Sequence, residues 1–93
     1  MVYVVVISKT VLKQLGKLPP NISRKLNLWI QLVADIGLEE ARMISGLHDE
    51  PLQGKRFGQR SVRLNKAYRV IYTVRRVENE KYVQVEEIHK HAY

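Results

Sequence analysis

The sequence predicts an α+β fold in which an N-terminal helical hairpin packs on one face of an antiparallel β-sheet. Between positions 11 and 36, apolar residues recur at intervals of three and four, as on one side of a helix. Between positions 61 and 88 they alternate with polar residues, as in strands that are buried on one side. A strand, two helices and then a three-stranded meander would give one helical layer over one sheet.

The N-terminal half is expected to start with a strand at 3–7, where β-branched and aromatic residues follow one another. Ser8 or Thr10 can cap a first helix, which should end near Gly16 because two prolines follow shortly after it. Pro20 suits the first turn of a second helix that ends before Gly37. A further helical turn or two over 38–44 should lead into a polar loop that runs through Gly54.

The C-terminal half is expected to be an antiparallel meander of three strands, at 61–65, 68–75 and 81–88. Short polar turns should join them at 66–67 and 78–80. The sequence shows no repeats or low-complexity segments. Residues 1–93 are therefore expected to form a single domain, since domains of about 100–200 residues are the rule.

Strand alternation predicts which side chains face the helices. Val62 and Leu64 should point to the core together with the apolar stripe of the second helix, which includes Trp29. Arg63 and Arg69 should then share the opposite, open face, brought together by the tight turn between their strands. A buried salt bridge is the alternative role for either arginine, and the scarcity of acidic residues nearby in the sequence argues against it.

Composition excludes several classes of protein. With 45% hydrophobic and 27% charged residues, the chain is typical of a globular protein. The absence of cysteine excludes disulfide scaffolds, thiolate metal sites and cysteine nucleophiles. The first residues lack a basic segment and an apolar run long enough to span a bilayer, so neither a signal peptide nor a membrane anchor is expected. We expect a cytoplasmic protein with no membrane partner.

The positive charge of the chain is concentrated in one stretch. The net charge is +7, and residues 55–76 contain no Asp or Glu. This segment carries eight basic residues: Lys55, Arg56, Arg60, Arg63, Lys66, Arg69, Arg75 and Arg76. Arginine dominates it, and the planar guanidinium matches a phosphate in bidentate fashion. A solvated face is the ordinary alternative for a basic run, but a nucleic acid, or an acidic protein that covers the patch, is the better match for this one.

The chain ends in a group of polar and aromatic residues. His89, His91 and Tyr93 are two residues apart and would project on one side of an extended strand. Val83 and Val85 have the same parity as the histidines, so a bulge or a bend is needed to turn the histidines away from the core. A frayed tail is the alternative. A zinc site that combines these histidines with His48 would need carboxylates from elsewhere and is not expected.

Three segments carry a resemblance to a known family. They are Pro51-Leu52-Gln53-Gly54-Lys55 leading into Arg60-Ser61-Val62-Arg63-Leu64, then Ala67-Tyr68-Arg69-Val70-Ile71-Tyr72, and finally Val85 to Tyr93. In their order and spacing, over essentially the whole chain, they resemble the RelE/ParE superfamily of toxins from bacterial type II toxin–antitoxin modules. The superfamily includes ribosome-dependent mRNA endonucleases of the RelE, YoeB and HigB types and gyrase inhibitors of the ParE type.

The resemblance implies roles for particular residues. Arg69 matches the nuclease arginine of the Tyr-Arg strand, and Arg63 matches a basic position that contacts the scissile phosphate. His91 and Tyr93 fall where nuclease members carry catalytic C-terminal residues, and a shift of register would select His89 or Lys90 instead. The remaining contacts to RNA are expected from basic residues along the chain, namely Lys55, Arg56, Arg60, Lys66 and Lys90.

The chemistry implied by the resemblance needs neither a metal nor a cofactor. The ribose 2′-hydroxyl attacks the adjacent phosphate and leaves a 2′,3′-cyclic phosphate and a 5′-hydroxyl. Arg63 and Arg69 would stabilise the charge that develops on the phosphorane. His91, or else His89, would transfer protons, and Tyr93 would stack on a base or hydrogen-bond the 2′-hydroxyl.

One departure from the family concerns the base. YoeB-like members carry a catalytic glutamate on the strand before the arginine, and residues 55–76 offer no acid, so the sequence identifies no carboxylate base. The expected function is an mRNA endoribonuclease toxin acting on the ribosome. A gyrase inhibitor and a nuclease-inactive RNA- or protein-binding module are the alternatives. The resemblance also implies a co-encoded antitoxin, which should be acidic to match the basic stretch.

Overall fold

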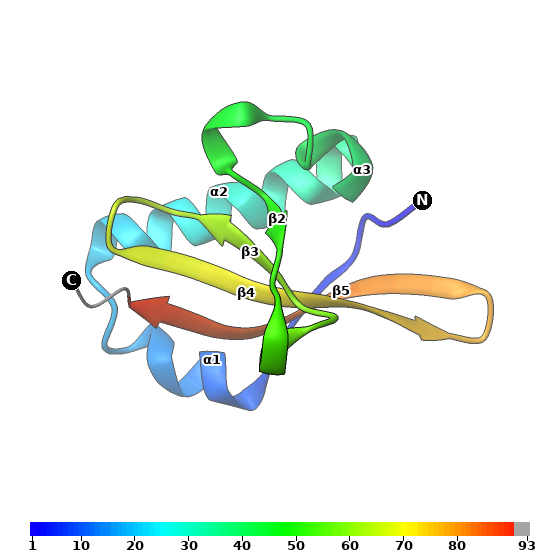
Figure 1. Cartoon of the computed structure of the whole chain (residues 1–93). Coiled ribbons are helices and arrows are strands. Elements are labelled where there is room, and N and C mark those ends of the chain that lie inside the picture. The colour runs from blue at the N-terminus through cyan, green and yellow to red at the C-terminus, as the bar shows by residue number, and fades with distance from the viewer. Residues whose placement is uncertain (91–93) are drawn as a thin grey trace.

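The computed structural model describes residues 1–90 as one five-stranded sheet accompanied by helices (Figure 1). The helices are α1 (Lys9–Leu15), α2 (Pro20–Ile36) and α3 (Leu38–Ala41), with two short 3-10 turns, η1 (Ser45–Leu47) and η2 (Gly54–Arg56). The strands are β1 (Val5–Ile7), β2 (Glu50–Pro51), β3 (Arg60–Arg63), β4 (Tyr68–Val77) and β5 (Glu80–Lys90). The predicted order of helices and strands is confirmed within these residues.

The sheet has the strand order β1-β5-β4-β3-β2. The predicted meander is confirmed, because β3, β4 and β5 pair antiparallel in succession. The sheet as a whole is mixed and not antiparallel throughout, since β1 runs parallel to β5. The chain leaves β1, crosses through the helices and returns to the same sheet, and such a crossover connection permits a parallel neighbour.

The polar loop expected after residue 44 contains a strand that the sequence pattern does not reveal. β2 has two residues and pairs with Arg60 and Ser61 at the edge of the sheet. Two residues are too few to show alternation, and Pro51 is tolerated only where its missing N–H faces no partner strand. The chain between residues 45 and 54 is therefore partly ordered by the sheet, and this brings Glu50 to the site described below.

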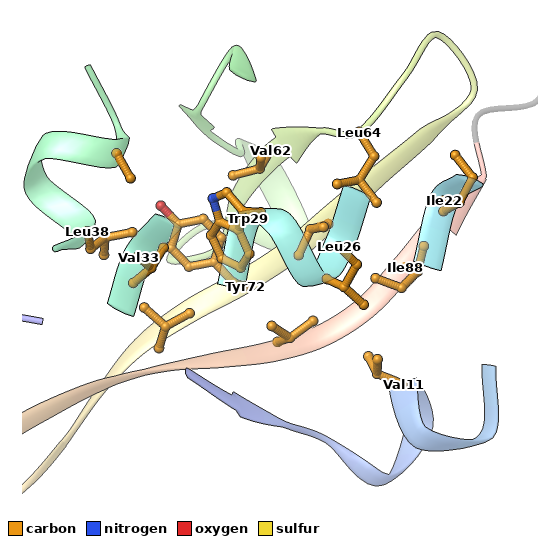
Figure 2. Close-up of a cluster of buried hydrophobic side chains, with 14 of the residues drawn as sticks. Val11, Ile22, Leu26, Trp29, Val33, Leu38, Val62, Leu64, Tyr72 and Ile88 are labelled. Atoms are coloured by element: carbon orange, nitrogen blue, oxygen red, sulfur yellow. The ribbon is translucent and has the colours of Figure 1, made fainter. Parts of the chain in front are cut away.

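The core lies between the sheet and the helices (Figure 2). It contains Val11 from α1, the stripe Ile22, Leu26, Trp29 and Val33 from α2, and the strand residues Val62, Leu64, Val70, Tyr72, Val83, Val85 and Ile88. The predicted core positions of Trp29, Val62 and Leu64 are confirmed. Figure 2 shows the Trp29 indole beside the Tyr72 ring. The centroids of the two rings are 5.4 Å apart.

The helix boundaries follow from local chemistry. Ser8 is the N-cap of α1, and its hydroxyl accepts a hydrogen bond from the Val11 amide at 3.2 Å. Pro20 begins α2, as expected for the first helical position. Gly37 ends that helix with φ 84°, and a Cβ at this position would lie 3.1 Å from the Tyr3 ring. Both its conformation and the close approach of Tyr3 therefore favour glycine. None of the helices in residues 1–90 is long and apolar enough to cross a membrane.

A bulge in β5 decides which way the C-terminal residues face. Tyr72 pairs with Val85 and Ile71 pairs with Glu87, so Glu86 is an extra residue on β5. Because of this insertion, Val85 and Ile88 both point into the core although their parity differs. His89 consequently lies on the opposite face, across from Arg69. Of the possibilities that the sequence left open at this end of the chain, a bulge is the one observed, and it turns His89 away from the core.

Candidate functional site

The candidate site lies on the face of the sheet that turns away from the core. Arg63, Arg69 and His89 are directly opposite one another on β3, β4 and β5. The neighbouring row on the same face consists of Glu50, Ser61, Ile71 and Glu87, one from each of the strands β2 to β5. The predicted sharing of one sheet face by Arg63 and Arg69 agrees with this register.

A hollow of about 260 Å³ opens on this face. It is lined by Glu50, Leu52, Arg56, Ser61, Arg69, Ile71 and His89. The segment that follows β2 turns back on itself, with the Leu52 amide bonded to the Gln59 carbonyl at 2.9 Å. Leu52 and Arg56 of this segment thus form one wall, and Ile71 is buried although it faces away from the core. The face is therefore a recessed site and not a flat, open surface.

Arg69 contacts two other residues that line this hollow. Its Nη1 donates to the Ser61 hydroxyl at 3.1 Å and lies 3.5 Å from Oε1 of Glu50. The Arg69 side chain is 25% exposed and that of Glu50 is 60% exposed, so the pair can be reached from solvent. A guanidinium with one side fixed by Ser61 and an exposed carboxylate can bind a phosphate and accept a proton at neighbouring positions.

The sequence contains few acidic residues near the basic stretch, and this argued against salt bridges. The structure contradicts that argument. Four of its arginines form ion pairs with acids from β5, β2 and the residue before β2: Arg56 with Glu87 at 2.5 Å, Arg60 with Asp49 at 2.6 Å, Arg69 with Glu50 at 3.5 Å and Arg75 with Glu86 at 3.3 Å. These acids lie outside residues 55–76, and sheet pairing brings them close. The positive field of this region is consequently smaller than its sequence indicates.

The other basic residues of the stretch keep their charges without an ion pair among residues 1–90. These are Lys55, Arg63, Lys66 and Arg76. Lys55 lies in η2, Lys66 in the turn between β3 and β4, and both are exposed. They remain available to a polyanion, whereas Arg56 and Arg60, which were predicted as RNA contacts, already bind carboxylates.

Arg63 and Lys90, which were predicted as site residues, do not line this hollow. Arg63 helps to line a second, larger hollow of about 480 Å³, formed with Lys25, Leu28, Trp29, Leu32, Gly46, Leu47 and Leu64. We call this hollow the α2 groove. Lys90 lies across from Tyr68, with Nζ 5.9 Å from the ring centroid, and so belongs to the side opposite Arg69. His91 and Tyr93 lie outside the described residues.

A buried polar cluster lies behind β2. The carboxylate of Asp49 is 2% exposed, and it accepts hydrogen bonds from Nε of Arg60 at 2.6 Å and from the Tyr72 hydroxyl at 2.5 Å. Burial and the hydrogen bond to Asp49 raise the pKa of Tyr72 far above its usual value. Burial by itself would lower the pKa of Arg60, but the hydrogen bond and the charge of Asp49, together with Tyr72, outweigh burial and the pKa is raised. Asp49 therefore stays paired with a neutral tyrosine and a charged arginine at neutral pH.

Glu50 and Asp49 are the residues that the sequence interpretation missed. A carboxylate base was expected on the strands next to Arg69 in sequence, within residues 55–76, and none is present there. The base candidate comes instead from β2, which joins the sheet beside β3. Their position just before Pro51, where the first segment of family resemblance begins, was the signal available. Among residues 1–90, no three His, Asp or Glu side chains are grouped closely enough to hold a metal ion.

Comparisons with known proteins identify the fold. No protein-family model and no curated protein sequence matches the chain. Several solved structures do. An archaeal RelE from a RelE–RelB complex of Pyrococcus horikoshii OT3 is 26% identical, with a TM-score of 0.71 over 97% of this chain and 96% of that chain. A YoeB/ParE toxin from Agrobacterium tumefaciens is 18% identical, with a TM-score of 0.71 over 96% and 99%.

A third similar structure is YafQ from Escherichia coli strain BL21(DE3), which is 17% identical with a TM-score of 0.70 over 92% of this chain and 90% of that chain. The likeness thus extends over nearly the whole length of each protein. It agrees with the order of segments noted in the sequence, from the strand at the N-terminus to the Tyr-Arg strand and the final strand. The chain thus has the fold of the toxins of the RelE/ParE superfamily.

Proposed function

We propose that the chain is the toxin of a type II toxin–antitoxin module and a metal-independent endoribonuclease that cleaves mRNA on the ribosome. It would act as a single domain in the cytoplasm, where mRNA is translated. The observation that carries this proposal is the arrangement of Glu50, Arg69 and His89 around one hollow, with Glu50 and Arg69 3.5 Å apart. This combination supplies a proton acceptor, a phosphate-binding cation and a second group able to transfer a proton.

Each step of the cleavage has a candidate residue. Glu50 accepts the proton of the 2′-hydroxyl, and the freed oxygen attacks the neighbouring phosphorus. Arg69, held by Ser61, stabilises the negative charge of the phosphorane, an effect worth about 3–4 kcal/mol for one well-placed donor. The bond from phosphorus to the 5′ oxygen breaks, and protonated His89 donates its proton to that oxygen. The products are a 2′,3′-cyclic phosphate and a 5′-hydroxyl.

RNA binding would use the cations that no acid neutralises. Lys55 and Lys66 lie in exposed turns, and Arg63 stands beside Arg69 on the same row of the sheet. Phe57 follows η2, is 82% exposed and offers a face on which a base can stack. His91 and Tyr93 follow β5 in sequence, so we retain them as proposed contributors to proton transfer and base stacking. Lys90 remains a proposed phosphate contact.

An antitoxin is the proposed protein partner. Similar structures include RelE with RelB, YoeB with YefM from Staphylococcus aureus and YafQ with DinJ from Escherichia coli. The α2 groove offers a matching surface on this chain, because its walls are mainly apolar and Lys25 and Arg63 supply positive charge. An amphipathic segment with apolar residues facing the groove and acidic residues at its borders would be complementary to it.

Expression of the protein in growing bacteria, followed by mapping of transcript 5′ ends, tests the proposed activity. We expect growth arrest with new 5′ ends inside translated codons, and none in transcripts whose start codon has been removed. An Arg69→Ala variant serves as the inactive control, and an Arg75→Ala variant, altered at an exposed ion pair outside the hollow, serves as the active one. Arrest with intact mRNA and blocked DNA replication would indicate a gyrase inhibitor. Normal growth would favour a binding module.

A further inference from the structure

Asp49 and Glu50 are neighbours in sequence but lie on opposite faces of the sheet. Glu50 pairs with Ser61 and faces Arg69, whereas the Asp49 carboxylate reaches Arg60 and Tyr72 on the core side. Strand alternation requires this arrangement once Glu50 is fixed on the site face. One residue of the pair is thus 60% exposed at the hollow, and the other is 2% exposed behind it.

We propose that the buried cluster of Asp49, Arg60 and Tyr72 positions Glu50 for proton transfer. The inference rests on the proposed function, in which Glu50 is the base. Asp49, Arg60 and Tyr72 do not line the hollow together with Arg69, so they act through Glu50 and are positioning residues. We call these three residues the anchor cluster.

The need for an anchor follows from the shortness of β2. The strand pairs only through Glu50 and Pro51, and it lies at the edge of the sheet. A two-residue edge strand contributes few backbone hydrogen bonds and opens readily by itself. The Asp49 carboxylate adds one bond to β3 through Arg60 and one to β4 through Tyr72. Both partners are fixed, since Tyr72 is fully buried against Trp29 and Arg60 is part of β3.

The anchor cluster also ties the base to the phosphate-binding group. Tyr72 and Arg69 belong to the same strand, β4, while Arg60 precedes Ser61, which accepts a bond from Arg69. A displacement of β2 would therefore move Glu50 relative to Arg69 and Ser61 without moving Arg69 itself. Displacements of about 1 Å in a reacting group can lower a rate by about 100-fold.

The first test compares Tyr72→Phe with the unaltered protein in single-turnover cleavage of ribosome-bound mRNA. The variant keeps the ring that packs on Trp29 and removes only the hydroxyl that binds Asp49. We expect the maximal cleavage rate to fall by about 10- to 100-fold. The toxin concentration for half-maximal rate should change less than twofold, because the RNA-binding cations are untouched. Tyr82→Phe, a partly exposed tyrosine on β5, is the matched control and should cleave normally.

A double-mutant comparison separates positioning of Glu50 from a general loss of structure. In a Glu50→Gln background the base is already absent, so Tyr72→Phe should cause little further loss of rate. Asp49→Asn, which keeps the size of the side chain and removes its charge, should behave in the same way. The inference would be overturned if Tyr72→Phe lowered the cleavage rate by the same factor in the Glu50→Gln background as in the unaltered protein. The anchor cluster would then act independently of Glu50.

Hydrogen exchange tests the anchor without any activity. The Leu52 amide, which follows β2 and bonds the Gln59 carbonyl, should exchange at least tenfold faster in Tyr72→Phe, while core amides of β4 stay protected. If the Leu52 amide exchanges faster in Tyr72→Phe but the unaltered protein cleaves no RNA, the anchor cluster does hold β2 in place and the proposed function is wrong. Unchanged exchange at Leu52, or accelerated exchange with an unchanged cleavage rate, overturns the inference.

Discussion

The side-chain amide of Gln14, on α1, makes two hydrogen bonds with the backbone of Ile88, on β5. Its Nε2 donates to the Ile88 carbonyl at 2.8 Å, and its Oε1 accepts from the Ile88 amide at 2.9 Å. β1 pairs with β5 only as far as Val85, so Gln14 occupies the place where a neighbouring strand would continue. The next residue is His89, which faces the hollow. A helix side chain thus completes the pairing of the strand that carries a proposed catalytic group.

Replacing Gln14 by Ala should therefore destabilise the end of β5. Two part-buried backbone groups of Ile88 would lose their partner, and each unsatisfied group costs about 1–3 kcal/mol, less where water can replace the bond. We expect the free energy of unfolding, measured by urea denaturation, to fall by about 1–3 kcal/mol. Gln31→Ala, on the exposed side of α2, should change it by less than about 0.5 kcal/mol. Equal effects of the two substitutions would contradict this interpretation.

Substitutions of Arg69 and Glu50 in the hollow should strongly reduce cleavage and leave the fold intact. Arg69→Ala and Glu50→Gln should each lower the cleavage rate by at least 100-fold, because one removes the proposed phosphorane-stabilising group and the other the proposed base. Arg69→Lys should not restore the rate, since an ammonium group lacks the planar fork. Circular dichroism and thermal unfolding provide the check on folding. Normal cleavage by Glu50→Gln would assign the base to another residue.

Binding to the ribosome should depend on Lys55 and Lys66 through simple charge. Both side chains lie in exposed turns and have no ion pair among residues 1–90. Each substitution by Gln should lower the slope of log affinity against log salt concentration by about 1 if the lysine contacts phosphate. Arg75→Gln is the control, since Arg75 is paired with Glu86 at 3.3 Å and should change the slope less. Slopes that do not differ among the three variants would show that these lysines do not contact phosphate.

The raised pKa of Tyr72 predicts how stability depends on alkaline pH. Burial and the bond to Asp49 favour the neutral phenol in the folded protein, while an unfolded tyrosine ionises near pH 10. The stabilising contribution of Tyr72 is therefore fully present below about pH 10, and it declines as the pH rises above that value. In Tyr72→Phe, the free energy of unfolding should be about 1–3 kcal/mol lower at pH 7 and should decrease less steeply above pH 10. Parallel profiles for the two proteins between pH 9 and 11 would refute this linkage.

The α2 groove can be tested as the antitoxin surface with one exposed leucine. Leu28 lines the groove and is 63% exposed, so Leu28→Asp should leave the fold intact and weaken binding of the co-encoded antitoxin. We expect a loss of about 10- to 100-fold in affinity, or about 1.4–2.8 kcal/mol, measured by titration calorimetry. Leu12→Asp on α1 is the control, because Leu12 is 58% exposed and does not line the groove. Unchanged affinity for Leu28→Asp would place the antitoxin elsewhere.

Local sequence patterns determined the helices, the meander and the core. The three- and four-residue spacing of Ile22, Leu26, Trp29 and Val33 is a property of α2 alone, and the alternation around Val62 is a property of β3. Such periods depend only on backbone geometry, so they can be read without knowing the neighbours of an element. The shared face of Arg63 and Arg69 follows from the same alternation. The sequence left the orientation of His89 open, and the bulge in β5 decided it.

Only the tertiary structure decided which charges meet. Glu50 lies 19 positions before Arg69 in the chain, and a two-residue strand without any periodic pattern brings the two side chains to 3.5 Å. The direction of β1 and the pairing of Asp49 with Tyr72 likewise arise from contacts between distant segments. Electrostatic interaction depends on separation in space and on burial, and neither can be derived from the distribution of charge along the sequence. For this reason residues 55–76 contain no acid in the sequence, yet four of their arginines are paired in the folded protein.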